Sequence, residues 1–370
     1  MKKILFFIHT LQVGGAERVL CNLVNAMDQK TFDITVQTIY QEDPGAYLRE
    51  GIHYRYCYGP RKHLRSLQMR AEAMLGLTYP LRIRDDYDIE VAYLECGTTK
   101  IMAASTNRKA VKIAWVHCDV EKLKDAEKFR KKSARYYQKY DRIICVSQSV
   151  RESFLRMFGD QPPVEVLYNV NDEDEILKKA LAFPVDHDAP ALVSVGRLYR
   201  EKGYDRLLTA CGQLKRQGLR FRLQILGEGP ERENLEAQLR QEQLSDCVRL
   251  VGFQENPYPY LKNADAVVCA SRYEGLSTVV TEALILGKPV VTTPCAGMQE
   301  LLGDSAFGLI TGDSAGELAE GLRRMLTDHA LRAHYAQQAQ LRGKSFSKAE
   351  IVGKTQELFE QLLLEKQQEI

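Results

Sequence analysis

Short apolar segments with the pattern of buried strands alternate with helical segments along nearly the whole chain, and this alternation restricts the fold more than any other feature. Strands joined through helices run parallel, so the pattern favours an α/β protein with doubly wound sheets. In the first half we expect strands at Lys3–His9, Asp33–Ile39, Ile89–Leu94, Val111–Val116 and Arg142–Val146, with helices near Ala16–Met27 and Glu121–Tyr137. In the second half we expect strands at Ala191–Val195, Arg222–Leu226, Val248–Val251, Ala266–Ala270, Pro289–Thr292 and Phe307–Ile310, with helices near Tyr204–Gln217, Glu231–Glu242 and Thr278–Leu286.

The length of the chain indicates two domains. Its 370 residues exceed the roughly 250–300 at which a single hydrophobic core stops growing. The segment Asn169–Pro190 is rich in Asp, Glu and Pro and separates the two series of strands. We therefore expect one domain over residues 1–170 and a second over 171–347. A final helical segment, Lys348–Glu365, could pack on either domain.

Composition indicates a folded protein of the cytoplasm. A hydrophobic content of 45% and a charged content of 27% are ordinary for globular proteins and exclude the disordered and fibrous classes. The nine cysteines are scattered without a Cys-x-x-Cys pair, which indicates a reduced protein without a cysteine metal site. The apolar run Ile4–Ile8 is too short for a signal peptide. No stretch approaches the ~18 apolar residues that would span a bilayer.

Positive charge is concentrated in the first half. Residues 53–84 contain seven Lys and Arg side chains and one acid, Glu72, interleaved with tyrosine, leucine and methionine. This mixture suits peripheral contact with a membrane that carries anionic lipid. A second basic run, Lys122–Lys139, fits a solvated helix face equally well. Nucleic acid is not an expected partner, because no recognition motif accompanies the charge.

Ligands of doubly wound sheets collect at the carboxyl ends of the strands, so the loops that follow the strands are the candidate site. Glycines that let a backbone approach a ligand follow the first strand, although they do not form a GxGxxG fingerprint. His117 follows Val111–Val116. A cationic pair, Arg197 and Lys202, follows Ala191–Val195 and suits a diphosphate. The glycines of these loops include Gly14, Gly15, Gly196, Gly203, Gly227 and Gly229.

The segment Ala264–Thr293 places two carboxylates, Glu274 and Glu282, beside a helix that begins near Ser277 or Thr278. The unpaired N–H groups of a helix start favour an anion such as phosphate. Carboxylates repel phosphate but accept strong hydrogen bonds from hydroxyls. Acids on both sides of an anion site therefore suit a ligand with hydroxyls at both ends of a phosphate linkage, such as a nucleotide sugar.

Other chemistries lack their motifs. The sequence has no Gly-x-Ser-x-Gly elbow and no Walker loop, which argues against hydrolases and P-loop enzymes. Two Asp-x-Asp triplets, 86–88 and 186–188, precede strands instead of ending them. We interpret both as turn carboxylates and expect no metal site. Group transfer is the class of reaction that remains.

These motifs together match a known family. The matching segments are 14–18, 116–117, 196–203, 226–230, 251–253 and, most specifically, Ser271–Ala283, which is similar to an E-x7-E motif. The chain resembles the retaining glycosyltransferases of family 4. The resemblance implies the GT-B architecture, in which two facing Rossmann-like, doubly wound parallel-sheet domains enclose an interdomain cleft. It also implies that residues 348–370 pack back on the first domain.

The resemblance implies roles for five side chains. Glu282 would accept hydrogen bonds from the nucleotide ribose, and Glu274 would hold hydroxyls of the donor sugar. Arg197 and Lys202 would clamp the diphosphate. His117 would contact the donor sugar and completes the expected catalytic set of His117, Glu274, Arg197 and Lys202.

Backbone groups would complete the donor site. Amides of Gly275, Leu276 and Ser277 would face the sugar and phosphate, although many family members have Phe with Gly or Pro in place of Leu276 and Ser277. The remaining expected donor-binding positions are Gly14, Gly15, Gly196, Gly227, Glu228, Gly252, Phe253 and Thr278. The nucleoside diphosphate sugar is a co-substrate, and neither cofactor nor metal is expected.

The expected activity is transfer of a hexose or N-acetylhexosamine from a nucleoside diphosphate sugar, UDP-linked, to a glycan or lipid-linked acceptor in surface or capsular polysaccharide synthesis. Two alternatives remain at this point. One is a GT-B epimerase that acts on a nucleotide sugar without an acceptor, and the other is a catalytically silent nucleotide-sugar-binding module. We expect a cytoplasmic protein that can associate with the inner face of the membrane.

Overall fold

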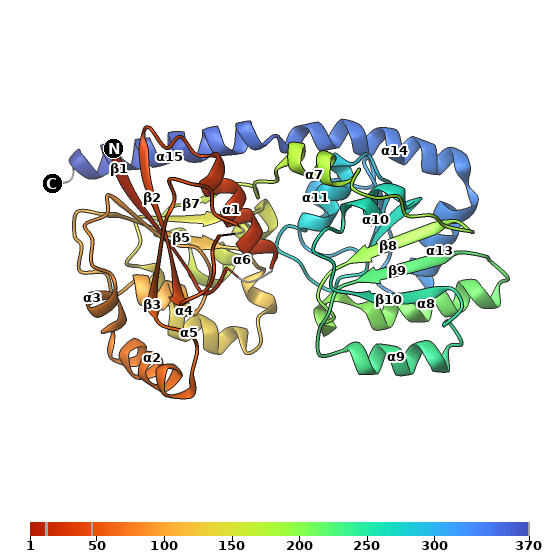
Figure 1. The fold of residues 1–370 in the computed structure, drawn as a ribbon, viewed down its shortest axis with the longest axis horizontal. Helices are drawn as coiled ribbons and strands as arrows, with labels where there is room; N and C mark the ends of the chain where they lie inside the picture. Colours follow the sequence, from red (N-terminus) through yellow and green to blue (C-terminus); the bar gives the residue numbers. More distant parts are fainter. Residues whose placement is uncertain (12–13, 46, 369–370) are drawn as a thin grey trace. The chain divides into compact units, whose positions relative to one another are not determined.

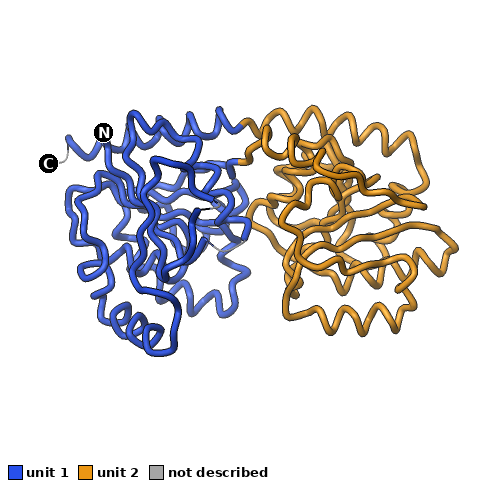
Figure 2. The backbone as a smooth tube through the Cα atoms, viewed as in Figure 1, with its two compact units in different colours: residues 1–170, 348–370 blue, residues 171–347 orange. Residues whose placement is uncertain are grey.

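The chain divides into two compact units in the computed structural model, which describes residues 1–11, 14–45 and 47–368 (Figure 1). Unit 1 comprises Met1–Val170 and Lys348–Ile370, and unit 2 comprises Asn171–Ser347 (Figure 2). Residues 369 and 370, part of the expected final segment, lie outside the described residues. Within the described residues, no helix combines the length and the apolar character needed to cross a membrane.

Unit 1 is built on a parallel sheet of seven strands in the order β3-β2-β1-β4-β5-β6-β7. The central strands are almost continuously apolar because helices cover the sheet, and residues 4–8 of β1 are fully buried. The strands are β1 (Lys2–Ile8), β2 (Phe32–Tyr40), β3 (His53–Tyr58), β4 (Ile89–Ala92), β5 (Val111–Val116), β6 (Arg142–Cys145) and β7 (Val164–Val166).

The helices of unit 1 come from both ends of the chain. They are α1 (Gly15–Ala26), α2 (His63–Leu75), α3 (Thr78–Arg82), α4 (Gly97–Met102), α5 (Ala126–Tyr137), α6 (Gln148–Phe158) and α15 (Lys348–Gln368). The last helix, α15, contacts α1 and β5. Its Phe359 is fully buried against Phe6 of β1, with ring centroids 6.1 Å apart.

Two expectations for unit 1 differ from the structure. The helix expected over Glu121–Tyr137 is divided into a 3-10 turn, Val120–Lys122, and α5, because Asp125 between them has a φ of +58°. The structure also forms strands β3 at residues 53–58 and β7 at residues 164–166, where the sequence analysis placed no strand. Tyr58 of β3 is buried, and the Tyr54 hydroxyl lies 2.8 Å from the Thr38 hydroxyl of β2.

Unit 2 is built on a parallel sheet of six strands in the order β10-β9-β8-β11-β12-β13. The two sheets confirm the expected α/β class with doubly wound parallel sheets. The strands are β8 (Ala191–Val195), β9 (Arg222–Leu226), β10 (Val248–Gly252), β11 (Ala266–Cys269), β12 (Val290–Thr292) and β13 (Leu309–Ile310).

Helices cover both faces of the second sheet (Figure 1). Helices α8 (Tyr204–Arg216), α9 (Arg232–Gln241) and α13 (Ala315–Thr327) form one layer, in which α8 contacts the other two. Helices α7 (Glu173–Lys179), α10 (Tyr258–Asn263), α11 (Thr278–Ile285) and α14 (His329–Gly343) form the other layer, and α12 (Met298–Leu302) precedes β13. The first layer buries leucines of α8 and α13 against the sheet.

The turn into α8 requires a glycine. Gly203 has a φ of +65°, and a Cβ at this position would overlap the backbone carbonyl of Ala270, which follows β11. Glycine therefore allows the loop after β8 to lie directly against the loop after β11. Gly218, just beyond the other end of α8, has a φ of +79° but faces open space.

We predict that Gly203→Ala lowers the free energy of unfolding of unit 2 by more than the ~1–3 kcal/mol that a left-handed backbone costs a residue with a side chain. The overlap with the Ala270 carbonyl adds to that cost. Gly218→Ala is the matched control, since it has the backbone cost alone. Calorimetric unfolding of both variants tests the prediction, and equal losses would contradict it.

Candidate functional site

The central contact of the candidate site joins the loops that follow two adjacent parallel strands, β8 and β11. The Lys202 ammonium Nζ lies 2.6 Å from Oε1 of Glu274, and the Ser271 hydroxyl donates a hydrogen bond of 2.7 Å to the same oxygen. The two charged side chains are only 23% and 13% exposed. Two residues 72 positions apart in the sequence thus form one partly buried ion pair.

The charge of Lys202 is preserved despite its burial. Burial by itself would lower the pKa of Lys202, but the negative charge and hydrogen bond of Glu274, together with Cys269, outweigh burial and raise this pKa above its ordinary value. Burial also raises the pKa of the Cys269 thiol, with a further contribution from Glu274. Lys202 is therefore a cation at neutral pH.

Glu282 lies in the helix that follows the loop of Glu274. It belongs to α11, is 4% exposed, and its Oε1 accepts a hydrogen bond of 3.1 Å from the Tyr258 hydroxyl of α10. At the start of the same helix, the Ser277 side chain caps the N–H of Val280. Leu276 is buried just before the cap. The segment Gly275–Thr278 therefore leads into a helix whose first turn is held by the Ser277 cap.

The loops after β8 and β9 also lie against each other. Gly227 has a φ of +142°, and a Cβ there would overlap the carbonyl of Gly196. The Gly227 N–H donates to the carbonyl of Gly252, the last residue of β10, at 2.8 Å. The expected glycines 196, 227 and 252 are thus brought together, and their first role is to let three strand ends approach.

Three other expected site residues of unit 2 lie on its surface. Arg197 is exposed, with its guanidinium 4.9 Å from the Tyr199 ring and 3.9 Å from the Glu201 carboxylate. Glu228 is bound to Arg232 of α9 at 2.6 Å. Phe253 is exposed directly after β10. The contacts of Arg197 and Glu228 therefore lie on the surface, outside the partly buried Lys202–Glu274 pair.

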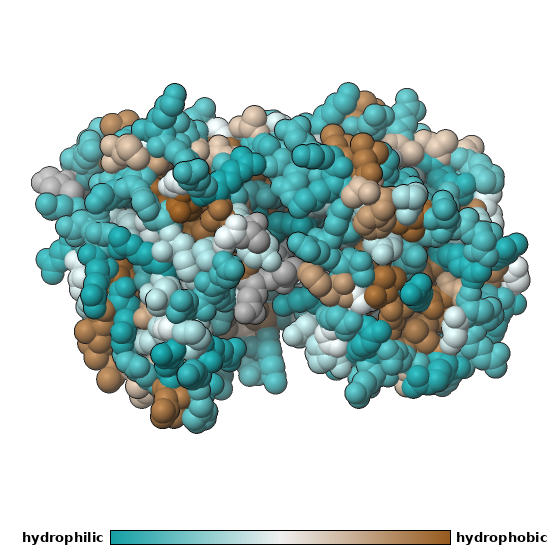
Figure 3. All heavy atoms as spheres, viewed as in Figure 1, coloured by the Kyte–Doolittle hydropathy of each residue, from teal (hydrophilic) through white to brown (hydrophobic). Residues whose placement is uncertain are grey.

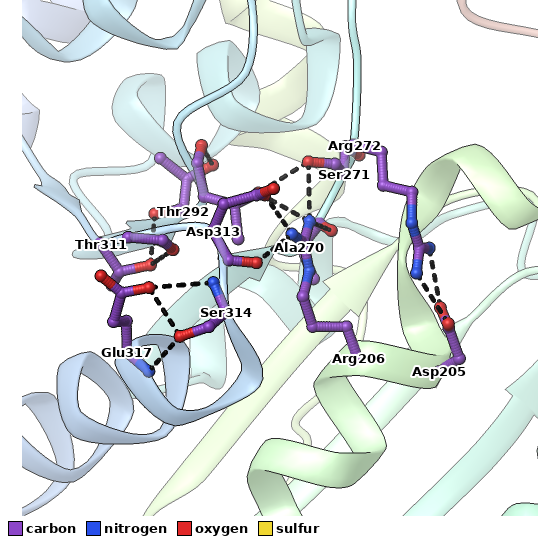
Figure 4. A network of polar contacts seen from close by, with 12 residues as sticks. Asp205, Arg206, Ala270, Ser271, Arg272, Thr292, Thr311, Asp313, Ser314 and Glu317 are labelled. Carbon is purple, nitrogen blue, oxygen red and sulfur yellow. Dashed lines mark hydrogen bonds and ion pairs between the residues drawn. The ribbon is translucent and has the colours of Figure 1, made fainter.

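A bracing network that the sequence analysis did not identify holds the loop between β11 and α11 (Figure 4). Arg206 of α8 donates to the backbone carbonyls of Ala270 and Ser271, at 2.7 and 3.2 Å. Arg272 forms a bidentate pair with Asp205 of α8, at 2.8 and 2.7 Å. The only feature of the sequence that pointed to this network was a charged pair, Asp205-Arg206, at the start of a helix that follows a glycine.

In unit 1, His117 directly follows β5. Its backbone N–H, and that of Cys118 at 2.8 Å, donate to one carboxylate oxygen of Glu95, which follows β4. The His117 ring lies 4.7 Å from the ring of Tyr93. Within the described residues, Nε2 of His117 is buried without a hydrogen-bond partner. Glu95 and Tyr93 were not identified from the sequence.

The imidazole of His117 is neutral. Burial lowers its pKa to about 3, and burial also raises the pKa of Glu95. A neutral ring with a buried free nitrogen can accept or donate one hydrogen bond to a hydroxyl. It does not bring a positive charge.

The glycines at the start of α1 were expected to approach a ligand from unit 1. Gly14 is the N-cap residue of α1 and Gly15 is its first residue. A Cβ at Gly14 would overlap the Glu17 carboxylate. Residues 12 and 13 of the same loop lie outside the described residues.

One carboxylate of each Asp-x-Asp triplet has a structural partner. Asp88 accepts a hydrogen bond of 2.7 Å from the Lys3 N–H, and Asp188 pairs with Arg222 at 2.6 Å. Across residues 1–11, 14–45 and 47–368, no group of three or more His, Cys, Asp and Glu side chains is arranged to hold a metal ion.

We predict that neutral, buried His117 makes unit 1 less stable in acid. The unfolded chain takes up this proton near pH 6.5, whereas the folded protein does so near pH 3. The contribution is therefore complete above about pH 6.5 and is lost as pH falls from there. Between pH 7.5 and 5.5 the loss is about 1.4 kcal/mol.

Urea unfolding followed by Trp115 emission tests this, because Trp115 is the single tryptophan and lies in β5 beside His117. His117→Asn should remove that part of the pH dependence. His334→Asn, which changes an exposed histidine of α14, should retain it. The same pH dependence in both variants would show that His117 is not neutralised by folding.

Comparison with known proteins identifies the family. The family description "Glycosyl transferases group 1" matches residues 175–342, and "Glycosyltransferase Family 4" matches residues 13–175. N-acetylgalactosamine-N,N'-diacetylbacillosaminyl-diphospho-undecaprenol 4-alpha-N-acetylgalactosaminyltransferase of Campylobacter jejuni is 31% identical over 95% of this chain and 97% of its own length. The lipopolysaccharide core biosynthesis glycosyltransferase LpsE of Rhizobium meliloti is 26% identical over 88% of this chain and 89% of its own length.

A solved structure shows the same fold. HepE of Anabaena, solved in complex with UDP and glucose, aligns with a TM-score of 0.79 and 19% identity over 98% of this chain and 100% of HepE. The fold of that neighbour, the two family matches and the Campylobacter relative agree with the resemblance seen in the sequence. The chain belongs to the family 4 glycosyltransferases and has their GT-B fold of two Rossmann-like units.

Proposed function

We propose that the protein is a retaining, metal-independent transferase that moves a hexose or N-acetylhexosamine from a UDP-sugar to a glycan or lipid-linked acceptor. The observation that carries the proposal is the contact between Lys202 and Glu274 at the ends of β8 and β11. It places a cation that suits phosphate beside a carboxylate that suits hydroxyls, as a sugar phosphate requires.

We infer the nucleotide of the donor, UDP, and the lipid-linked acceptor from similar proteins. HepE was solved with UDP and glucose, which supports a uridine nucleotide. The Campylobacter relative is named for an acceptor on diphospho-undecaprenol, and the Rhizobium relative for lipopolysaccharide core biosynthesis. These names support an acceptor of surface polysaccharide synthesis.

In the proposed reaction the bond between the anomeric carbon and the phosphate oxygen breaks, and the acceptor oxygen bonds to the same face of that carbon. The departing phosphate oxygen takes the acceptor proton, so no protein carboxylate serves as nucleophile. Lys202 and Arg197 stabilise the charge that develops on the leaving diphosphate. The Lys202 ammonium has three N–H donors, so it can bind phosphate with one of them while the Glu274 carboxylate accepts hydrogen bonds from hydroxyls of the sugar.

Glu282 and His117 complete the proposed donor contacts. Tyr258 holds one oxygen of the Glu282 carboxylate at 3.1 Å, and this carboxylate is proposed to accept hydrogen bonds from the ribose hydroxyls. His117 is proposed to contact the donor sugar through Nε2, which is buried and has no partner among the described residues. Since the ring is neutral, it would bind a hydroxyl without adding a positive charge.

We predict that Lys202→Ala weakens binding of both a UDP-sugar and free UDP, because both contain the diphosphate. Loss of one charged hydrogen-bond partner costs about 1.5–3 kcal/mol, which corresponds to roughly tenfold to a hundredfold in affinity. Lys215→Ala is the matched control, since Lys215 pairs with Asp246 on the surface of the same unit at 2.5 Å. Calorimetric titration measures both ligands, and unchanged UDP affinity in Lys202→Ala would refute the assignment.

Glu282→Ala should weaken UDP-sugar binding by roughly tenfold to a hundredfold for the same reason. Its matched control is Glu320→Ala, which changes an exposed glutamate of α13 that pairs with Arg323. Thermal shift against a set of sugar nucleotides identifies the donor, because a ligand that binds the native state raises its stability. Wild-type donor affinity in Glu282→Ala would contradict a ribose contact.

Product analysis separates the alternatives. A transferase consumes the UDP-sugar only with an acceptor and releases UDP. An epimerase converts the nucleotide sugar in water alone, and a silent module binds it without turnover. Either of the last two outcomes would overturn transfer while leaving the donor site in place.

A further inference from the structure

Helix α2 packs with its polar side toward unit 1. Glu72 accepts a hydrogen bond of 2.5 Å from the Tyr58 hydroxyl of β3 and pairs with Arg82 of α3 at 2.6 Å. Ser66, less than two turns earlier, accepts a hydrogen bond of 3.3 Å from the Tyr40 hydroxyl of β2. The hydrogen bond from Arg82 contributes most to holding the pKa of Glu72 at about 2. The helix is therefore attached to the unit mainly by polar contacts.

The apolar side of α2 faces outward. Leu64 and Met74 are each 80% exposed, Leu75 is 69% exposed and Leu67 is 49% exposed. Together with the exposed Ala71, these positions form a stripe about 100° wide at 3.6 residues per turn. Figure 3 shows apolar side chains gathered over α2 on the lower part of unit 1.

This orientation is the reverse of an ordinary surface helix, which turns its apolar stripe to the core. Single exposed apolar side chains are common and need no explanation. A continuous stripe on a helix with no buried residue is different, because α2 gains nothing from it in the folded unit. The stripe is the property expected of a helix that lies in a membrane interface.

The charge around the stripe is positive. Lys62 at the start of the helix and Arg70 beside the stripe are exposed, and neither forms an ion pair among the described residues. Glu72, the only acid of residues 53–84, lies away from the stripe and is neutralised by Arg82. The outward surface therefore combines apolar side chains with cations, which complements a surface of anionic lipid.

We propose that α2 is an interfacial helix that inserts Leu64, Leu67, Met74 and Leu75 into a bilayer surface containing anionic lipid. This narrows the membrane contact expected for residues 53–84. The tyrosines of β3 belong to the sheet, whereas the exposed face of α2 carries the contact. The proposal extends the proposed function by placing unit 1 where a lipid-linked acceptor is found, and its test uses no sugar nucleotide.

Vesicle co-sedimentation tests the proposal on the full chain, with phosphatidylcholine vesicles that contain or lack phosphatidylglycerol. The wild type should bind the anionic vesicles. Leu64→Ser combined with Met74→Ser should lower this binding at least about tenfold, because two apolar side chains no longer leave water. Leu181→Ser combined with Leu364→Ser changes two exposed leucines elsewhere and should bind as wild type does.

Lys62→Gln combined with Arg70→Gln tests the electrostatic part. Each cation removed should lower binding to anionic vesicles about fivefold, and the difference from wild type should disappear in high salt. Undiminished binding by either α2 variant would overturn the proposal. So would concentration-dependent self-association of the wild type that Leu64→Ser with Met74→Ser abolishes, since the stripe would then bind a second copy.

Insertion is measured directly by Met74→Trp. Trp115 is buried in β5, so the added indole on α2 dominates any change on vesicle binding. Its emission should shift to the blue and be quenched by brominated lipid, and Leu364→Trp should show neither effect. Urea unfolding of the serine variant, followed by the emission of Trp115 in β5, shows that unit 1 is folded and requires no nucleotide, which keeps this result separate from the donor site. If Met74→Trp binds vesicles without a blue shift, the contact is made by charge alone and insertion is overturned.

Discussion

Parallel pairing of β8 with β11 is the constraint on which the site of unit 2 depends. It brings two carboxyl ends to the same edge of the sheet, so the loops after them must meet although 72 residues separate Lys202 from Glu274. Close approach then restricts each loop. Gly203 makes room for the Ala270 carbonyl, and Arg206 binds that carbonyl from the first turn of α8. Backbone fit and side-chain chemistry are therefore coupled at this edge.

The Lys202–Glu274 pair is a compromise between stability and binding. A partly buried charge left without a partner costs more than an exposed one, so each side chain satisfies the other. In the proposed function, a ligand that offers phosphate to Lys202 and hydroxyls to Glu274 adds a contact to each side chain. The proposal therefore favours a ligand that carries both groups close together over a simple anion, which adds a contact to Lys202 only.

Much of the fold could be predicted because buried parallel strands are nearly continuous apolar runs. Val111–Val116, Ala191–Val195 and Arg222–Leu226 have the predicted bounds. Strand β3 was missed because its alternation of tyrosine with polar residues, which also fits a strand at the edge of a sheet, was interpreted as part of a membrane segment. The break before α5 was missed because a left-handed Asp125 leaves no periodic signal.

The candidate site was predictable only where a local motif carries it. The loops with Lys202 and Glu274 follow recognisable strands, and the structure joins these two residues. Glu95, Arg206 and Tyr258 act through partners 22 to 64 residues away. One sequence does not tell which carboxylate or hydroxyl meets which backbone amide. The outward orientation of α2 is likewise a result of packing, since a helical stripe does not reveal which side faces the core.

The packing of α15 on unit 1 has a consequence for how the chain is made. Phe359 completes the core around Phe6, and Gln356 accepts a hydrogen bond from the Asp28 N–H at 2.7 Å. A ribosome releases these residues only after all of unit 2. Unit 2, whose residues are contiguous, can finish folding before α15 is made, whereas the unit that is synthesised first has to wait with an incomplete core until α15 has been synthesised.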